Sequence, residues 1–167
     1  MKKILEKIDK NEIIEYFRSS NKKFAVGNYV GAIQDFAVFT SITPFGKNEG
    51  YRFVKFKDLK QIGKSTEYLQ KIEKKIEMRN FKNRKTVILK KEKFFNNLFE
   101  YFIKNKVMLR IIYKDDNVWD SYLIKITKDY FYFQILENPE YSSIEFVRKD
   151  QIKYIEIGRV IWKNGIN

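Results

Sequence analysis

The chain contains no cysteine and no histidine. The absence of cysteine excludes disulfide bonds, thiolate nucleophiles and cysteine-based zinc sites. The absence of histidine removes the commonest general base and the commonest metal ligand. An enzyme of this composition would depend on carboxylate, lysine, serine or tyrosine chemistry, and the sequence holds no motif for it. We therefore expect a protein that is not an enzyme and that uses no metal and no cofactor.

Long apolar segments are also missing. The chain starts with the basic sequence Met1-Lys2-Lys3, but the short apolar pair that follows is interrupted at once by Glu6, Lys7 and Asp9, so no apolar region of a signal peptide can form. No run approaches the roughly 20 apolar residues of a membrane span. We expect a cytoplasmic protein without a membrane partner.

Positive charge is the most prominent feature that is present. The formal net charge is +13, and lysine outnumbers arginine 27 to 7. Residues 1–66 carry 13 basic and 7 acidic side chains, residues 67–106 carry 12 and 5, and residues 107–167 carry 9 of each. A basic protein favours nucleic acid or another anionic surface as its partner. Lysine binds phosphates with little discrimination between bases.

Three short segments of the first half recur in the second. The pairs are Ile13–Phe17 with Leu98–Phe102, Tyr29-Val30-x-x-Ile33 with Tyr122-Leu123-x-x-Ile126, and Phe53–Lys55 with Phe146–Arg148. The first pair is 85 residues apart and the other two are 93 apart. Each copy of a repeat is one packed unit, so the pattern predicts two related units. The smaller first offset predicts that copy one has a shortened or lost first strand.

The local patterns predict an α+β protein dominated by strands. Asp9-x-x-Glu12 resembles a capping box and predicts a short helix that includes Ile13–Phe17. Thr43–Asn48 has the composition of a turn, and Ser65 or Thr66 is placed to cap a second helix. Aromatic and β-branched runs predict strands at residues 24–33, 36–42, 51–56, 59–63, 107–113, 118–126, 130–136, 143–148 and 152–157.

This order of elements predicts two helix-plus-small-barrel units. The first covers residues 1–66, the second covers residues 91–167 and begins with a helix at about 91–105, and residues 67–90 form a basic helical linker. A helix followed by five short antiparallel strands, with a single turn before the last, resembles the Sm-like small β-barrel family. Val30–Asp35 is similar to the start of that family's Gly-x-Leu pattern. The resemblance is architectural and assigns no nucleotide pocket, and SH3-like barrels and OB-folds are built from similar strands.

The candidate binding residues follow the positive charge. Neutralising phosphates needs only a row of mobile cations, although such a row is equally typical of a solvated helix face with pairs such as Glu67–Lys71. Aromatic side chains next to basic ones are candidates for stacking on unpaired bases. The basic candidates are Lys71, Lys74, Lys75, Arg79, Lys82, Arg84, Lys85, Lys47, Arg52 and Lys55. The stacking candidates are Phe45 and Tyr51, with Tyr130, Tyr132 and Tyr141 in the neutral half.

We therefore expect a non-catalytic protein that binds RNA or single-stranded DNA mainly through the backbone. The alternative is an adaptor or inhibitor that uses the same lysines to dock on an acidic protein surface. A metal-dependent nuclease site built from Asp35, Glu49 and Asp58 is a distant third, because nothing in the sequence brings these carboxylates together. The aromatic segment 94–103 is expected to pack the two copies together or, less favoured, to form a homodimer interface.

Overall fold

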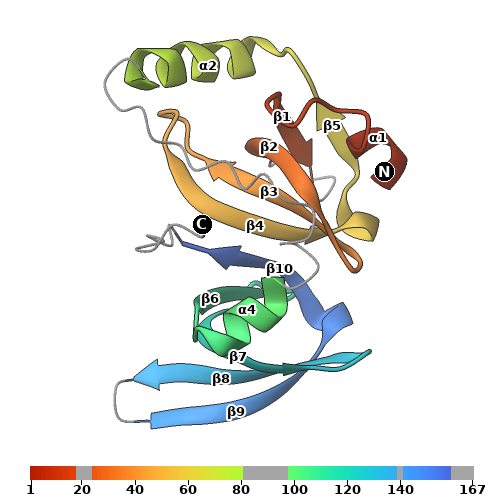
Figure 1. Cartoon of the computed structure of the whole chain (residues 1–167), viewed down its shortest axis with the longest axis vertical. Coiled ribbons are helices and arrows are strands. Elements are labelled where there is room, and N and C mark those ends of the chain that lie inside the picture. The colour runs from red at the N-terminus through yellow and green to blue at the C-terminus, as the bar shows by residue number, and fades with distance from the viewer. Residues whose placement is uncertain (18–23, 81–97, 139–140, 159–167) are drawn as a thin grey trace. The chain divides into compact units, whose positions relative to one another are not determined.

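A computed structural model describes residues 1–17, 24–80, 98–138 and 141–158 (Figure 1). The chain divides into two compact units, Met1–Leu98 and Phe99–Asn167. Each unit contains five strands in an antiparallel sheet. None of the helices in the described residues is long and apolar enough to cross a membrane.

The described residues of the first unit form a five-stranded sheet and two α-helices. Its strands are β1 (Ile13–Phe17), β2 (Phe24–Ile33), β3 (Phe36–Ile42), β4 (Asn48–Lys55) and β5 (Gln61–Gly63). Helix α1 (Lys2–Leu5) precedes them, a single 3₁₀ turn (Phe56–Asp58) separates β4 from β5, and helix α2 (Glu67–Asn80) follows. The predicted strands 24–33 and 36–42 are confirmed with the same bounds.

The predicted helix at Ile13–Phe17 is wrong, because this segment is strand β1. Asp9 caps a turn instead of a helix, since its carboxylate accepts a hydrogen bond from the Asn11 amide at 2.7 Å. β1 pairs with β2 on one side and with β5 on the other, and its first four residues are all buried. A strand covered on both faces has no alternating pattern, so its apolar run cannot be distinguished from a helix by periodicity.

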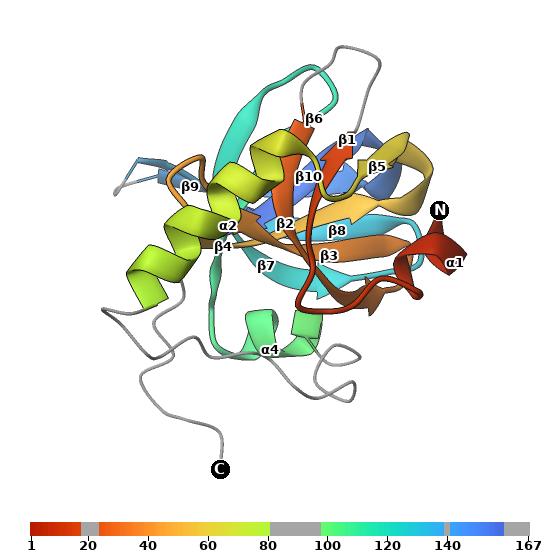
Figure 2. The ribbon, with the colours of Figure 1, turned by 90° about the horizontal axis from the view of Figure 1, so that it is seen from above.

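The two faces of β1 contact different layers. On one face Tyr16 stacks on Phe39 with ring centroids 4.0 Å apart. On the other face Ile13 joins Leu69 and Ile72 of α2 in a buried cluster, with Ile76 packed against it. Helix α2 therefore lies across the strands of its own unit, as Figure 2 shows. Leu69, Ile72 and Ile76, which recur at helical spacing, form the face with which this helix packs.

The sequence predicted that either Ser65 or Thr66 caps the start of helix α2. The Thr66 hydroxyl accepts a hydrogen bond from the Leu69 amide at 3.2 Å, so Thr66 is the capping residue. The same hydroxyl donates to the Glu15 carboxylate on β1 at 2.6 Å. Glu15 is buried, and its negative charge near the helix N-terminus complements the helix dipole. The cap thus fixes the start of α2 to strand β1.

The second unit has the same sequence of elements. Helix α4 (Leu98–Lys104) begins just before it, and its strands are β6 (Met108–Tyr113), β7 (Val118–Ile126), β8 (Tyr130–Asn138), β9 (Tyr141–Arg148) and β10 (Ile152–Ile157), with a 3₁₀ turn (Lys149–Gln151) before β10. Phe99 and Phe102 are buried, and the Phe99 ring lies 5.6 Å from Phe131 of β8. These rings belong to the core of this unit, and the homodimer stays a prediction.

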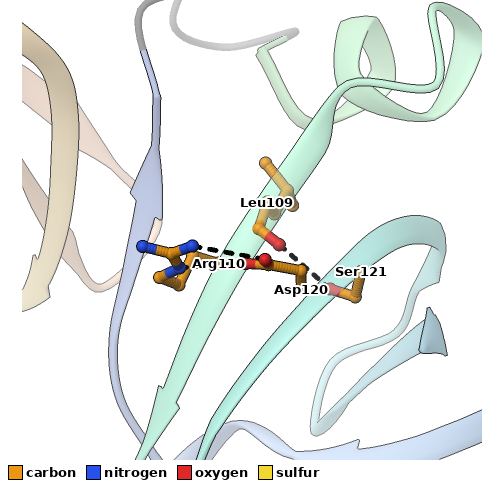
Figure 3. A network of polar contacts seen from close by, with 4 residues as sticks. All are labelled: Leu109, Arg110, Asp120 and Ser121. Atoms are coloured by element: carbon orange, nitrogen blue, oxygen red, sulfur yellow. Dashed lines mark hydrogen bonds and ion pairs between the residues drawn. The ribbon is translucent and has the colours of Figure 1, made fainter. Parts of the chain in front are cut away.

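A polar pair fastens β6 to β7 on the exposed side of the second unit (Figure 3). The Arg110 guanidinium donates from Nε and Nη2 to the two carboxylate oxygens of Asp120, at 2.9 and 3.2 Å. The adjacent Ser121 is buried and its hydroxyl donates to the Leu109 carbonyl at 3.5 Å. Hydrogen bonding to Asp120 and the charge of its carboxylate raise the pKa of Arg110. Arg110 therefore links β6 to β7 through its bond to Asp120.

The prediction of two closed barrels is wrong, because the sheet is open. The strand order is β5-β1-β2-β3-β4 in the first unit and β10-β6-β7-β8-β9 in the second. Among the described residues no pairing joins the two ends of either order, β4 with β5 or β9 with β10. Closure depends on pairing between distant strands, whereas the pattern of short strands and turns is the same in an open sheet and in a barrel.

The repeated segments fall on matching elements only where they are 93 residues apart. β9 and its following 3₁₀ turn begin and end 93 residues after β4 and its turn, and β7 ends 93 residues after β2. The two similar segments that are 85 residues apart differ in structure, because the first is strand β1 and the second lies in helix α4. The first strand of copy one is present as β1, with five residues against six in β6, so it is not lost.

Candidate nucleic-acid interface

The turn between β3 and β4 is built by three hydrogen bonds. The Thr43 amide donates to the Lys47 carbonyl at 2.9 Å, and the Gly46 amide donates to the Thr43 carbonyl at 2.9 Å. The Thr43 hydroxyl accepts from the Lys47 amide at 3.1 Å. Gly46 has a φ of +72°, a conformation that glycine adopts without strain. The predicted turn is confirmed, and it holds Phe45 and Lys47 at its tip.

This hairpin loop packs directly on helix α2. A Cβ built on Gly46 would lie 2.9 Å from Cγ1 of Ile76 and 3.1 Å from the Ile76 amide nitrogen. Lys75 reaches across from the helix and donates from Nζ to the Pro44 carbonyl at 2.9 Å. The loop and the helix, about 30 residues apart in sequence, therefore form one surface. We name Phe45, Lys47, Lys71, Lys74 and Lys75 the hairpin–helix surface.

Phe45 is exposed at the centre of these contacts. Its residue surface is 68% accessible, although phenylalanine is usually buried. The Lys75 ammonium lies 5.6 Å from the centroid of the Phe45 ring, which is the geometry of a cation–π contact. The ring is thus held next to a cation while most of its area stays open to solvent.

Most charges of α2 are separated around its axis, although Glu67 shares the row of Lys71 and Lys75. Lys71, Lys75 and Arg79 are spaced four residues apart, which places them along one side of a helix. Glu73 and Glu77 have the same spacing on a different side. Because Lys75 contacts Pro44, the basic side is the one that borders the hairpin loop. Lys47, Lys74 and Lys75 are exposed beside it.

Lys71, one of the basic candidates, forms the ion pair with Glu67 that is expected on a solvated helix face. Lys71 Nζ lies 2.6 Å from a carboxylate oxygen of Glu67, and both side chains are exposed. Such a pair contributes about 0.3–0.5 kcal/mol and can exchange for a phosphate at little cost. Lys71 therefore remains part of the surface.

The other predicted residues are placed elsewhere. Lys55 is 1% exposed at the end of β4, with its ammonium 5.8 Å from the Phe36 ring, and its side chain is therefore not presented to solvent. Arg52 and Tyr51 are half-buried on β4, and burial raises the pKa of Tyr51. The backbone of Arg79 lies in α2. Lys82, Arg84 and Lys85 lie outside the described residues.

Two features of the surface were missed from the sequence alone. The candidates in the loop and in the helix were treated as separate groups, because nothing in the spacing predicted that Gly46 packs on Ile76. The contact between Lys75 and Phe45 was missed for the same reason. A usable signal was present in Thr43-Pro44-Phe45-Gly46, since a turn that exposes a phenylalanine at its tip leaves the ring without core contacts.

The carboxylates considered for a nuclease do not form a cluster. Asp35 lies in the turn between β2 and β3, where its carbonyl accepts from the Phe56 amide at 3.0 Å, Glu49 is exposed on β4, and Asp58 lies in the 3₁₀ turn. Within the described part of the chain, no three acidic side chains lie close enough to hold a metal ion.

Comparison of the chain with protein-family models, with curated proteins and with solved structures finds no match. The Sm-like resemblance stays a prediction, and the function rests on the geometry and charge of the described residues.

Proposed function

We propose that this protein binds single-stranded nucleic acid, RNA or single-stranded DNA, through the hairpin–helix surface. The observation that carries the proposal is the exposed ring of Phe45, which stands between exposed lysines and is held against Lys75. Phosphate contacts supply affinity through counterion release, and an exposed ring supplies a platform on which an unpaired base stacks. The role is not catalytic, and a cytoplasmic location is part of the proposal.

The arrangement favours a single strand over a duplex. In a duplex the base faces are stacked on one another, so a ring at a loop tip has no base to stack on. Lysine ammonium groups make point-charge contacts and lack the planar fork with which arginine reads guanine. We therefore expect binding that depends on salt and on accessible bases and that depends little on sequence.

The proposal is tested by fluorescence anisotropy with labelled strands of about 20 nucleotides. The probes are single-stranded RNA, single-stranded DNA and a DNA duplex, each titrated with the full chain at two salt concentrations. We expect tighter binding to the single strands than to the duplex, with a dissociation constant near physiological salt below the roughly 10⁻⁴–10⁻⁶ M that is typical of non-specific binding at that salt.

A matched pair of charge variants locates the site. Lys74→Gln with Lys75→Gln removes two charges from the surface, and Lys57→Gln with Lys60→Gln removes two charges from the 3₁₀ turn and the residues before β5. That turn follows the end of β4 opposite the hairpin, a strand about 26 Å long for eight residues. Only the first pair is expected to weaken binding substantially. Equal weakening by both pairs would show that binding reflects net charge alone.

The stacking component is tested by Phe45→Ala. One base stacked on one ring contributes about 1–3 kcal/mol, so the variant should bind single strands about 5- to 150-fold more weakly. Because Phe45 is exposed, its truncation should leave the folding stability almost unchanged. Failure of every probe to bind better than about 10 µM would contradict the proposal and direct the search to an acidic protein partner.

A further inference from the structure

The second unit exposes aromatic and aliphatic side chains on one face of its sheet. Phe146 of β9 is 64% exposed, Ile144 is 61% exposed and Tyr130 of β8 is 40% exposed. Alternate residues of the same strands point the other way, because Phe131, Phe133 and Val147 are all buried. An exposed cluster of large apolar side chains is unusual on a protein without a partner at that surface.

Cross-strand pairing places two of the rings in direct contact. Tyr132 pairs with Phe146 across β8 and β9, and their ring centroids lie 4.8 Å apart at an interplanar angle of 69°. Tyr130 occupies the next position on the same face of β8 and pairs with Arg148. The three rings therefore follow one another over two adjacent strands. We name Tyr130, Tyr132 and Phe146 the aromatic face; Ile144 lies beside them on the same side of the sheet and carries no ring.

Cations border this face. The ammonium of Lys125 lies 5.7 Å from the centroid of the Tyr132 ring, and Lys125 pairs with Tyr132 across β7 and β8. The Arg148 side chain is 62% exposed and holds Asp150 through two hydrogen bonds of 3.1 and 2.9 Å. Two cations therefore pair with the rings of this face, Lys125 with Tyr132 and Arg148 with Tyr130.

The corresponding phenylalanine of the first unit does not share this exposure. Phe53 stands 93 residues before Phe146 in the repeated Phe-Val-basic segment and is fully buried, as is the following Val54. In the second unit Val147 is still buried, but the phenylalanine is turned to solvent. The exposed ring is thus a property of this face and does not follow from the repeated segment.

We propose that the aromatic face is a second nucleic-acid site, on which unpaired bases of a single strand stack while Lys125 contacts its phosphates. Sheet faces with exposed rings bind single strands in this way, because every base has a π-face that can lie on a ring. The border of cations favours a polyanion over an apolar protein segment as the occupant. The proposal rests on nucleic-acid binding as the function of the chain, but it uses residues that the hairpin–helix surface does not contain.

The test uses the full chain and two labelled strands of about 20 nucleotides. One is oligo(dT), and the other is an abasic strand with the same number of phosphates. Variants at Phe146 separate a ring from an apolar surface: Phe146→Ala removes both, Phe146→Leu keeps apolar area without a ring, and Phe146→Trp keeps the ring. Ile144→Ala is the matched control, because it is equally exposed on the same face and carries no ring.

We expect Phe146→Ala and Phe146→Leu to weaken binding of oligo(dT) by about tenfold, with Phe146→Trp and Ile144→Ala close to the original protein. Binding of the abasic strand should be equal for all of them. Phe146→Leu binding as well as the original protein would overturn the proposal in favour of apolar docking. Equal loss of affinity for both strands would also overturn it, because the ring would then act only through the shape of the protein.

The two proposals fail in different ways. If Lys74→Gln with Lys75→Gln weakens binding of both strands and no Phe146 variant has an effect, binding at the hairpin–helix surface is supported and binding at the aromatic face is refuted. If only the Phe146 variants weaken binding of oligo(dT), binding at the aromatic face is supported and binding at the hairpin–helix surface is refuted. If the original protein binds neither strand, both proposals are refuted.

Discussion

Replacement of Gly46 by alanine tests the packing that creates the hairpin–helix surface. Gly46 has a φ of +72°, and a residue with a side chain pays roughly 1–2 kcal/mol to adopt a left-handed conformation. A Cβ at this position would lie 2.9 Å from Cγ1 of Ile76, well inside the 3.5–4.0 Å of ordinary carbon contact. Displacing a packed neighbour costs about 1–3 kcal/mol more. We therefore expect Gly46→Ala to destabilise the first unit by about 2–5 kcal/mol.

The assay is urea unfolding followed by far-ultraviolet circular dichroism, because both tryptophans, Trp119 and Trp162, lie in the second unit. With an m-value of about 1–3 kcal/mol/M, a loss of 2 kcal/mol lowers the midpoint by about 1 M. Gly158→Ala is the control, since no atom lies within 4 Å of a Cβ built there. The loop can also relieve the overlap by leaving the helix, in which case stability is partly kept and amide hydrogen exchange in residues 67–77 becomes faster.

Either response should also weaken binding of single strands several-fold, because Lys75 would no longer be held against Phe45. A Gly46→Ala protein with an unchanged urea midpoint, unchanged exchange in α2 and unchanged binding would refute the packing of the loop on Ile76. The hairpin–helix surface would then have no basis as a single site.

Three further predictions concern stability. Gly27→Ala should destabilise the protein by several kcal/mol in urea unfolding, because its Cβ would stand 1.8 Å from the Thr40 carbonyl oxygen and force the backbone of β3 to move. Desolvation opposes ionisation of Asp150, but the charge and hydrogen bonds of Arg148 dominate and lower its pKa. This contribution to stability is present above the unfolded pKa of about 3.9 and is lost as pH falls through the lowered folded value, so thermal melts of Asp150→Asn and the original protein should differ at neutral pH and converge as the pH falls below that folded value. Burial, followed by two nearby carboxylates, raises the pKa of Tyr113 to about 12. The unfolded chain then releases this proton first, so stability should fall more steeply from about pH 10 to pH 12 in the original protein than in Tyr113→Phe, and equal slopes would contradict the assignment.

The strands and turns could be predicted from the sequence because their signals are local. Phe36–Ile42 is a compact aromatic and β-branched run that ends at a turn with proline and glycine, and its predicted and observed bounds agree. Leu69, Ile72 and Ile76 recur at helical spacing and are the residues with which α2 packs. In these segments propensity, periodicity and turn chemistry all indicate the same structure.

The errors arose where long-range pairing decides the structure. Ile13–Phe17 is buried on both faces between β2 and β5, so it shows no strand alternation, and Asp9 supplied a misleading capping signal. The closed barrel was inferred from strand lengths that are equally compatible with an open sheet. The similarity between Ile13–Phe17 and Leu98–Phe102 reflects composition, since one is a strand and the other begins a helix.

The candidate site was predictable in its residue types but not in its assembly. The positive charge of α2 and the turn that carries Phe45 were both identified in the sequence. Their contact depends on Gly46 and Ile76, which carry no charge and no nucleic-acid signature. Lys55 was named as a phosphate contact because of its positive charge, but the fold buries its side chain at the end of β4. Tyr130 and Tyr132 were named from the sequence as stacking candidates, whereas Phe146 was added only by the cross-strand pairing that places it beside Tyr132.

The most direct test of the central claim is ultraviolet crosslinking of the full chain to a single-stranded RNA of about 20 nucleotides, followed by mass spectrometry of the crosslinked peptides. If the hairpin–helix surface binds the strand, crosslinks form at residues 43–47 and disappear in Phe45→Ala. Crosslinking that leaves residues 43–47 unmodified, under conditions in which the RNA is bound, would contradict the claim.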